Sequence, residues 1–142
     1  MLTASLPLRT RNDATMTRQR VTGIGGFFFK ARQPEELSRW YSTHLGVDPV
    51  PESYGGSVWR QEAGPTALTA MSADSEVFGD AKNSWSLNFR VSDLDAMVAQ
   101  LRSADIAVEV DPETYPIGRF ATLRDPEGNV LQLWQPDGAA PA

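Results

Sequence analysis

The feature that most restricts the fold of this chain is an internal repeat, in which the two halves align without a gap at an offset of sixty residues. The matched pairs are Gly26 with Ser86, Phe28 with Asn88, Lys30 with Arg90, Gln33 with Asp93, and Leu37 with Met97. In both halves the alignment passes from a strand-like segment into one with helical spacing of apolar residues. Two similar modules packed together are therefore expected.

The first half begins with a predicted strand over Val21–Ala31. A helix is predicted to follow, because Pro34 suits the first helical position and Gly46 suits the position after the last turn. Its apolar residues recur at helical spacing, at Leu37, Trp40, Tyr41 and Leu45. Shorter strands are expected over 47–50, 57–62 and 66–71, and the polar residues 73–83 form a linker.

The second half repeats this order. Trp85–Val91 is a predicted strand, and Ser92 or Asp93 can cap a helix with an apolar stripe. That stripe is Leu94, Met97, Val98 and Leu101. Ile106–Val110 is a further strand, and a hairpin completes the unit. The sequence thus predicts an α+β fold of two βαβββ modules, residues 21–72 and 84–136, whose curved mixed sheets surround a cavity with the helices outside.

The closing hairpin, Gly118–Pro136, has the most specific local pattern in the chain. Residues 125–129, Asp-Pro-Glu-Gly-Asn, form a turn in which Asp125 can bind backbone amides and Gly128 can take a positive φ. In the strand that follows, Gln132 stands between two leucines. An amide that faces away from two leucines indicates a functional surface on that side of the sheet.

Composition narrows the classes of function. The 142 residues suit one domain, and the net charge of −5 argues against a nucleic-acid partner. No apolar run is long enough for a membrane span, and without cysteine there is no thiolate metal site. His44 is the single histidine and is expected at the end of the first helix. We expect a cytoplasmic protein with a disordered tail at 1–20 and a short C-terminal tail at 137–142.

Three segments together resemble the vicinal oxygen chelate superfamily, which includes glyoxalase I, extradiol dioxygenases, and fosfomycin- and bleomycin-resistance proteins. They are Phe27–Gly46, Asn88–Leu101 and Gly118–Pro136. The turn at 125–129 and the strand that ends in Trp134-Gln135-Pro136 are the most specific part. The resemblance implies paired βαβββ modules around a cavity that holds the chemistry or the ligand.

In metal-using members of that superfamily, ligands occupy the first strand of each module and the last strand of the second. Carried over, these positions fall on Gly26, Ser86 and Gln132, none of which is a histidine or a carboxylate. Divalent metals need imidazole or charged oxygen donors. Because none of these three positions supplies such a donor, we expect a site without metal or other cofactor.

Alternation along the strands places a mixed set of residues on the inner face of the expected cavity. These are Phe28, Lys30, Ser86, Asn88, Arg90, Phe120, Thr122, Val130, Gln132 and Trp134, with Trp59, Glu62, Tyr115 and Arg119 at its rim. The aromatic residues could equally fill space between sheets, and the cations could be solvated. Asn88 and Gln132 either bond each other or serve a ligand, since an unpaired buried amide costs about 1–3 kcal/mol.

Two functions fit this lining. The first is a metal-free protein, similar to the bleomycin-resistance branch, that holds an aromatic or planar small molecule. The second is an enzyme, a lyase, isomerase or dioxygenase-like member of the superfamily, either metal-independent or with a divergent metal site. A third, weaker hypothesis is a collapsed cavity in an interaction module. Because many superfamily members are dimers, a homodimer is expected, with no nucleic-acid or membrane partner.

Overall fold

The computed structural model of the chain describes residues 18–80 and 82–137. Most of the two predicted tails therefore lies outside the described residues. By its internal contacts the chain divides into two compact units, residues 1–30 and residues 31–142. The described part of the first unit, 18–30, is extended and contains no helix or strand. All the elements below belong to the second unit.

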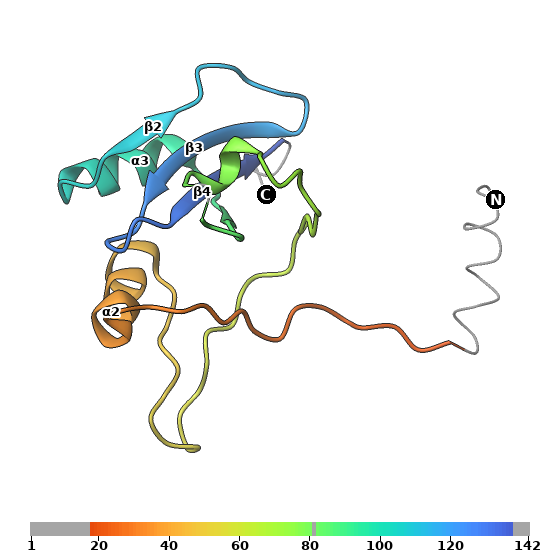
Figure 1. Cartoon of the computed structure of the whole chain (residues 1–142), viewed down its shortest axis with the longest axis vertical. Helices are drawn as coiled ribbons and strands as arrows, with labels where there is room; N and C mark the ends of the chain where they lie inside the picture. The colour runs from red at the N-terminus through yellow and green to blue at the C-terminus, as the bar shows by residue number, and fades with distance from the viewer. Residues whose placement is uncertain (1–17, 81, 138–142) are drawn as a thin grey trace. The chain divides into compact units, whose positions relative to one another are not determined.

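The predicted α+β class is confirmed, and the second half of the chain forms the complete unit (Figure 1). In chain order it consists of β1 (Leu87–Arg90), α3 (Leu94–Ser103), β2 (Val108–Val110), β3 (Gly118–Arg124) and β4 (Val130–Pro136). The strands make one open mixed sheet in the order β1-β4-β3-β2. β1 pairs with β4 in parallel, while β4 with β3 and β3 with β2 are antiparallel.

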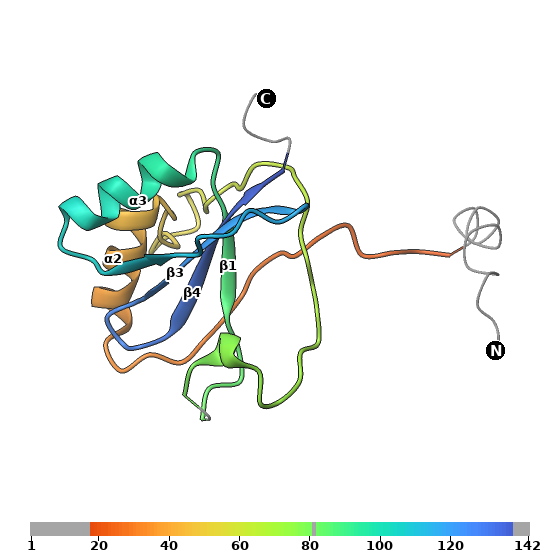
Figure 2. The ribbon, with the colours of Figure 1, turned by 90° about the horizontal axis from the view of Figure 1, so that it is seen from above.

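The core lies on one face of this sheet, where both helices pack (Figure 2). Leu131 and Leu133 of β4 are fully buried, as are Leu94 and Leu101 of α3. Each such leucine contributes about 1.5–3 kcal/mol relative to an exposed one. The alternation predicted for β4 is therefore confirmed, because Gln132 projects to the opposite face from its two leucine neighbours.

Helix α2 (Pro34–Leu45) begins at the predicted proline and ends where Gly46 takes a φ of +75°. It starts sixty residues before α3, as the repeat predicts (94 − 34 = 60). Asp93 caps α3 by accepting a hydrogen bond from the Ala96 amide. His44 lies in the last turn of α2, the place expected for it.

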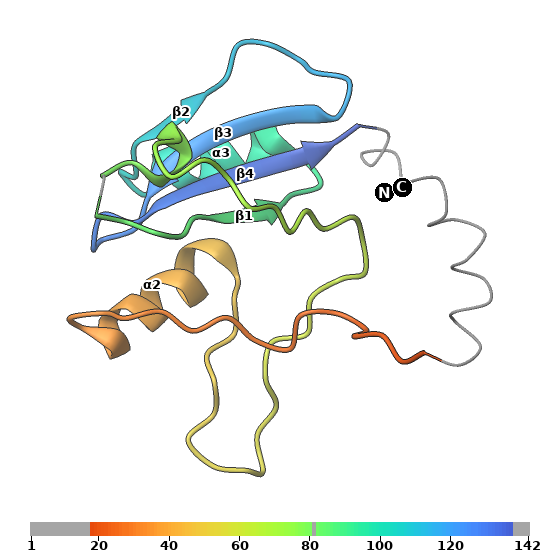
Figure 3. The ribbon, with the colours of Figure 1, turned by 45° about the vertical axis from the view of Figure 1, so that its right-hand side comes forward.

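The first half departs from its repeat, since none of the four strands expected at 21–31, 47–50, 57–62 and 66–71 is formed. Residues 47–72 run as one long extended loop, drawn in yellow in Figures 1 and 3. Its apolar side chains at Val50, Val58 and Leu68 are exposed. A local pattern favours extended backbone, but a strand also needs a neighbouring strand for its amides and carbonyls. Among the residues that the structure describes, none of these segments takes part in a sheet. The linker contains one short 3-10 helix, η1 (Glu76–Phe78).

Candidate functional site

The sheet face opposite the helices carries the polar and aromatic residues expected in the cavity. We call it the open face and define it by its half-buried or exposed side chains: Asn88 and Arg90 on β1, Gln132 and Trp134 on β4, and Phe120 and Thr122 on β3. The strand register places Asn88 beside Gln132, and Arg90 beside Trp134. Across the hairpin, Thr122 pairs with Gln132, and Phe120 with Trp134. Six of the ten predicted ligand-binding residues are thus brought together.

An amide pair lies at the centre of this face. Asn88 donates a hydrogen bond of 3.0 Å from Nδ2 to Oε1 of Gln132. Of the two alternatives for these amides, bonding to each other is the one observed. Each side-chain amide has two N–H groups and a carbonyl, so the pair retains hydrogen-bonding capacity for a ligand placed above it.

Three aromatic rings form a shelf at one end of the open face. Phe120 and Trp134 are stacked, with centroids 6.2 Å apart and an interplanar angle of 5°, and Tyr115 meets Phe120 edge-on at 6.0 Å. The Trp134 indole N–H donates to the Ile117 carbonyl at 2.8 Å. These contacts fix the ring planes and leave Tyr115, Phe120 and Trp134 half-buried. We call these three residues the aromatic shelf.

Two further interactions hold the shelf. Gly118 has a φ of +128°, and a Cβ there would come within 2.9 Å of the Trp134 indole nitrogen and 2.1 Å of the Gln135 carbonyl. Only glycine therefore allows β3 to start this close to β4. The Tyr115 hydroxyl donates to Asp111 at 2.8 Å, and this bond, followed by one with Glu113, raises the Tyr115 pKa to about 12. The phenol consequently stays protonated at neutral pH.

Arg90 lies at the sheet edge next to the shelf. Its Nη2 donates at 3.0 Å to the carbonyl of Glu62, which belongs to the 47–72 loop. Its guanidinium also packs on Gly64, where a Cβ would come within 2.1 Å of Nη1. Residues 61–65, which we call the strap, are thus fastened along the β1 edge. At the far end of the face, Gly79 lies against Val130.

The three positions that correspond to family metal ligands do not fit a divalent metal. The Ser86 hydroxyl donates to the Val130 carbonyl at 2.9 Å, and the Gln132 carbonyl oxygen accepts from Asn88. Gly26 has no side chain and belongs to the first unit. Within residues 18–80 and 82–137, no three His, Cys, Asp or Glu side chains are grouped so that they could hold a metal ion.

Three of the remaining predicted site residues, Arg119, Trp59 and Ser86, lie off the open face, and the fourth, Phe28, belongs to the first unit. Arg119 forms a bidentate ion pair with Asp95 of α3, with nitrogen–oxygen distances of 3.1 and 3.2 Å, and so lies toward the helices. Trp59 is 38% exposed in the 47–72 loop, and Phe28 is 92% exposed in the first unit. Ser86 lies beside the face, with its hydroxyl engaged as described.

The structure also contains a hollow that sequence reasoning missed. It has a volume of about 600 Å³ and lies between α2 and the turn at 125–129. Its lining is Arg32, Gln33, Glu36, Leu37, Arg39, Trp40, Thr43, His44, Pro126 and Glu127. Half of these side chains are both polar and exposed. Trp40 and His44, one helical turn apart, are the signal that could have indicated it. In the sequence, Trp40 fits the apolar spacing of the helix and His44 fits the helix end.

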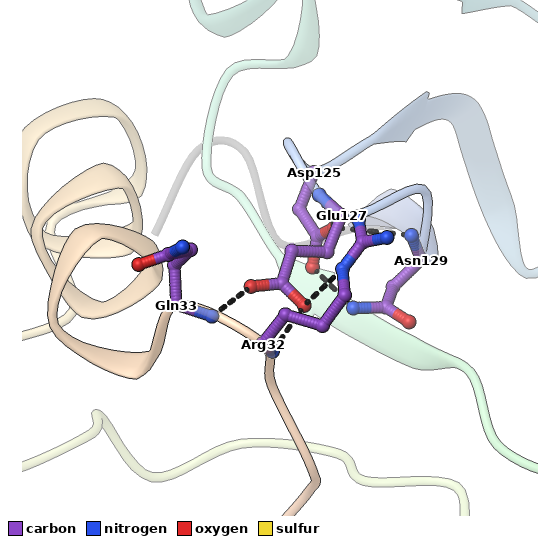
Figure 4. A network of polar contacts seen from close by, with 5 residues as sticks. All are labelled: Arg32, Gln33, Asp125, Glu127 and Asn129. Carbon is purple, nitrogen blue, oxygen red and sulfur yellow. Dashed lines mark hydrogen bonds and ion pairs between the residues drawn. The ribbon is translucent and has the colours of Figure 1, made fainter.

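A carboxylate network fastens α2 to this turn (Figure 4). Glu127 accepts the backbone amides of Arg32 and Gln33, each at 2.8 Å, and is 3.8 Å from the Arg32 guanidinium. It thus binds the amides of the two residues that lead into α2, whose N-cap residue Gln33 makes no side-chain cap bond. The two amides, and then the Arg32 charge, hold the pKa of Glu127 below its usual value.

Comparison with known proteins agrees with this architecture. The sequence profile described as the glyoxalase-like domain matches residues 26–134. The chain therefore belongs to the glyoxalase-like family, and the resemblance to the vicinal oxygen chelate superfamily is confirmed. Within the described residues, no helix has the length and apolar character needed to cross a membrane.

Individual relatives show how far the likeness extends. CFP32 of Mycobacterium bovis and of Mycobacterium tuberculosis, provisionally named a glyoxylase, is 33% identical over 82 residues. These cover 52% of this chain and 31% of the relative, so the chain spans about a third of that protein's length.

Two solved structures share the fold. TnmS3, an antibiotic-binding protein of Streptomyces sp. CB03234, is 23% identical with a TM-score of 0.57, covering 84% of this chain and all of that one. A lactoylglutathione lyase of Agrobacterium tumefaciens is 19% identical with a TM-score of 0.53, covering 82% of this chain and 96% of that one.

Proposed function

We propose that the protein binds a planar aromatic small molecule on the open face of its sheet, without a metal. The observation that carries this proposal is the aromatic shelf beside the Asn88–Gln132 pair, on the sheet face opposite α2 and α3. A half-buried stacked pair offers a flat apolar surface with a preset orientation. A ring placed against it gains about 0.5–1.5 kcal/mol beyond simple area burial.

Polar groups next to the shelf would orient such a ligand. Binding sites combine apolar walls with a few fixed polar groups, and here the Asn88–Gln132 pair and Thr122 supply these groups beside Phe120 and Trp134. The hollow beside α2 offers less, because two backbone amides and an arginine already engage its Glu127 carboxylate.

A metal-independent enzyme could use Glu62, Tyr115 or Arg119 as acid, base or electrostatic stabiliser. Binding is favoured over catalysis because two of these three are engaged elsewhere and Glu62 is exposed in the 47–72 loop. The Tyr115 hydroxyl is bonded to Asp111, and Arg119 is paired with Asp95. The fold itself does not decide the matter, since one structural relative binds an antibiotic and another is a lyase. The proposal therefore rests on the site and not on these relatives.

Calorimetric titration with 2-naphthamide, a neutral two-ring compound, tests the proposal. We expect saturable binding that Trp134→Ala weakens about tenfold or more, through lost stacking and lost buried area. Trp40→Leu, in the hollow beside α2, is the matched control and should leave binding unchanged. The reverse pattern would place the ligand at the hollow and contradict the proposal.

We also propose that the protein is a homodimer. Support comes from the exposed apolar residues of the 47–72 loop and from the repeat, whose second copy shows how the equivalent segments pair when neighbours are present. Light scattering should give about twice the chain mass of 15.6 kDa. A monomer at all concentrations would overturn this. The expected cytoplasmic location stays a prediction, which cell fractionation would test.

A further inference from the structure

We propose that the aromatic ligand carries an anionic group, such as a carboxylate, and that Arg90 binds it. This inference rests on the proposed function of the open face and specifies the chemical class of its ligand. Three features of the structure carry it: the position of Arg90, the groups that its guanidinium contacts, and the distribution of charge over the face.

Arg90 is placed to reach a substituent of a ring on the shelf. It is the register partner of Trp134, with β1 and β4 in parallel, so both side chains rise from the same face on adjacent strands. Adjacent strands lie about 4.8 Å apart, which is close to the width of an aromatic ring. A group projecting from a ring stacked at Trp134 toward β1 therefore meets Arg90 first.

The guanidinium of Arg90 has donors to spare and an uncompensated charge. It has five N–H groups, and its hydrogen bond is to a neutral acceptor, the Glu62 carbonyl. Among residues 18–80 and 82–137, no carboxylate lies within ion-pair distance of it, whereas Arg119 and Arg32 each have one. Arg102 and Arg124 also bond to carbonyls, but those lie within six residues along the chain and away from the shelf.

Charge on the rest of the face permits an anion at this place. The carboxylates of Asp111 and Glu113 bond Tyr115, and Phe120 and Trp134 follow Tyr115 across the shelf before Arg90 is reached. The Glu62 carboxylate is exposed on the strap. Glu109, on β2, is in register with the open-face residue Thr122. β2 lies three strands from β1, about 14 Å away at the usual strand spacing. Salt screens solvent-exposed charges beyond about 8–10 Å. The protein as a whole carries a net negative charge, whereas Arg90 places a positive charge on the open face. This charge would fix the orientation in which an anionic ligand binds.

The competing role for Arg90 is purely structural, since it fastens the strap through Glu62 and Gly64. The two roles make different predictions for the replacement of Arg90. If Arg90 only holds the strap, its loss should weaken the binding of all ligands alike. If Arg90 binds an anion, its loss should weaken the binding of an acid and leave the affinity for its neutral analogue unchanged.

The experiment compares 2-naphthoate with 2-naphthamide and with the cation 2-naphthylmethylammonium by calorimetry at neutral pH. These probes share a ring and differ in charge. We expect the acid to bind about tenfold more tightly than the amide, because its carboxylate would form a charge-assisted hydrogen bond with Arg90. The cation should bind most weakly. High salt should reduce the preference for the acid.

Arg90→Gln should abolish the preference for the acid while leaving amide binding in place, and Arg90→Lys should retain part of it. Arg119→Gln is the matched control, because Arg119 lies toward the helices in an ion pair with Asp95, and it should leave the preference unchanged.

Each other outcome has a distinct meaning. Equal binding of acid and amide to the native protein overturns the anion assignment and leaves the proposed aromatic site standing. Equal weakening of both probes by Arg90→Gln shows that Arg90 only fastens the strap, and overturns the assignment. If no naphthyl probe binds, the proposed function itself fails and this inference fails with it.

Discussion

The carboxylate of Asp125 is 4% exposed, yet both of its oxygens have protein donors. Oδ1 accepts the backbone amides of Glu127 and Asn129, and Oδ2 accepts the Tyr41 hydroxyl and the Asn129 side-chain amide. An ion buried this deeply is stable only when such bonds replace water. The residue expected to organise a turn therefore also connects that turn to α2.

Removing one of these donors should destabilise the fold. Tyr41→Phe deletes the 2.7 Å bond to Asp125 but keeps the buried ring, so unfolding by urea should show a loss of about 1–2 kcal/mol. The burial of Tyr41 and its bond to Asp125 also raise the pKa of its hydroxyl, which therefore stays protonated and can donate near neutral pH. Tyr54→Phe, at a fully exposed tyrosine, is the control and should change stability by less than about 0.5 kcal/mol. A neutral result for Tyr41→Phe would contradict this account.

Glu127 should make stability depend on pH. Its folded-state pKa is lowered, mainly by the amides of Arg32 and Gln33, so its stabilisation is fully present above the ordinary value of 4.5. It is lost as the pH falls through the lower folded-state value. Glu127→Gln should therefore be less stable than the native protein at neutral pH, and the difference should shrink in acid, as followed by urea unfolding at several pH values.

The control for this titration is Glu52→Gln, at an exposed residue. As a substitution of an exposed side chain, it should change the free energy of unfolding by less than about 0.5 kcal/mol. A gap between native and Glu127→Gln that stays constant from neutral to acid pH would show that the carboxylate charge is not what holds α2.

At the scale of elements, two glycines show what the hairpin requires. Gly118 and Gly128 both have positive φ, +128° and +85°, but a Cβ at Gly128 meets nothing within 4 Å, whereas one at Gly118 would overlap the Gln135 carbonyl. Gly128→Ala should cost about 1–2 kcal/mol from backbone strain alone. Gly118→Ala should cost clearly more and disturb Trp134, with both effects read from urea unfolding and tryptophan fluorescence. Equal costs would show that β3 can move away from β4.

Local signals were sufficient for the elements whose partners are close in sequence. The caps at Pro34, Gly46 and Asp93 and the turn at Asp125 define their own geometry, so both helices and the hairpin were predicted correctly. The alternation of side chains around Gln132 also predicted which residues lie on the open face. The attachment of Glu127 to Arg32 and Gln33 was not predictable, because it joins residues more than ninety positions apart.

The same distinction explains the errors in the first half. A segment such as 66–71 has a strand-like composition, but pairing is a property of two segments and cannot be read from one. Arg119 shows a similar limit at the site. Its position next to Phe120 suggested the rim, whereas the charge of Asp95 on α3 draws it to the other side.

At the scale of the whole molecule, the two copies of the repeat differ in how much of their chain is protected. β3 and β4 pair along seven residues each, while most of 47–72 is exposed. Hydrogen exchange should therefore be slow in the second half and fast over 57–62 and 66–71 in dilute protein. If a second copy covers these segments, their exchange should slow as protein concentration rises. Concentration-independent exchange would contradict the proposed homodimer.

The link between Glu127 and the start of α2 has a consequence for biosynthesis. α2 is synthesised before the carboxylate that binds the residues leading into it, because Glu127 lies 95 residues after Arg32 and 94 after Gln33. An isolated helix of twelve residues is only marginally stable in water. During synthesis α2 therefore lacks its contact with Glu127 until the β3–β4 hairpin is made. In a nascent chain halted before residue 127, we expect α2 to be only partly helical.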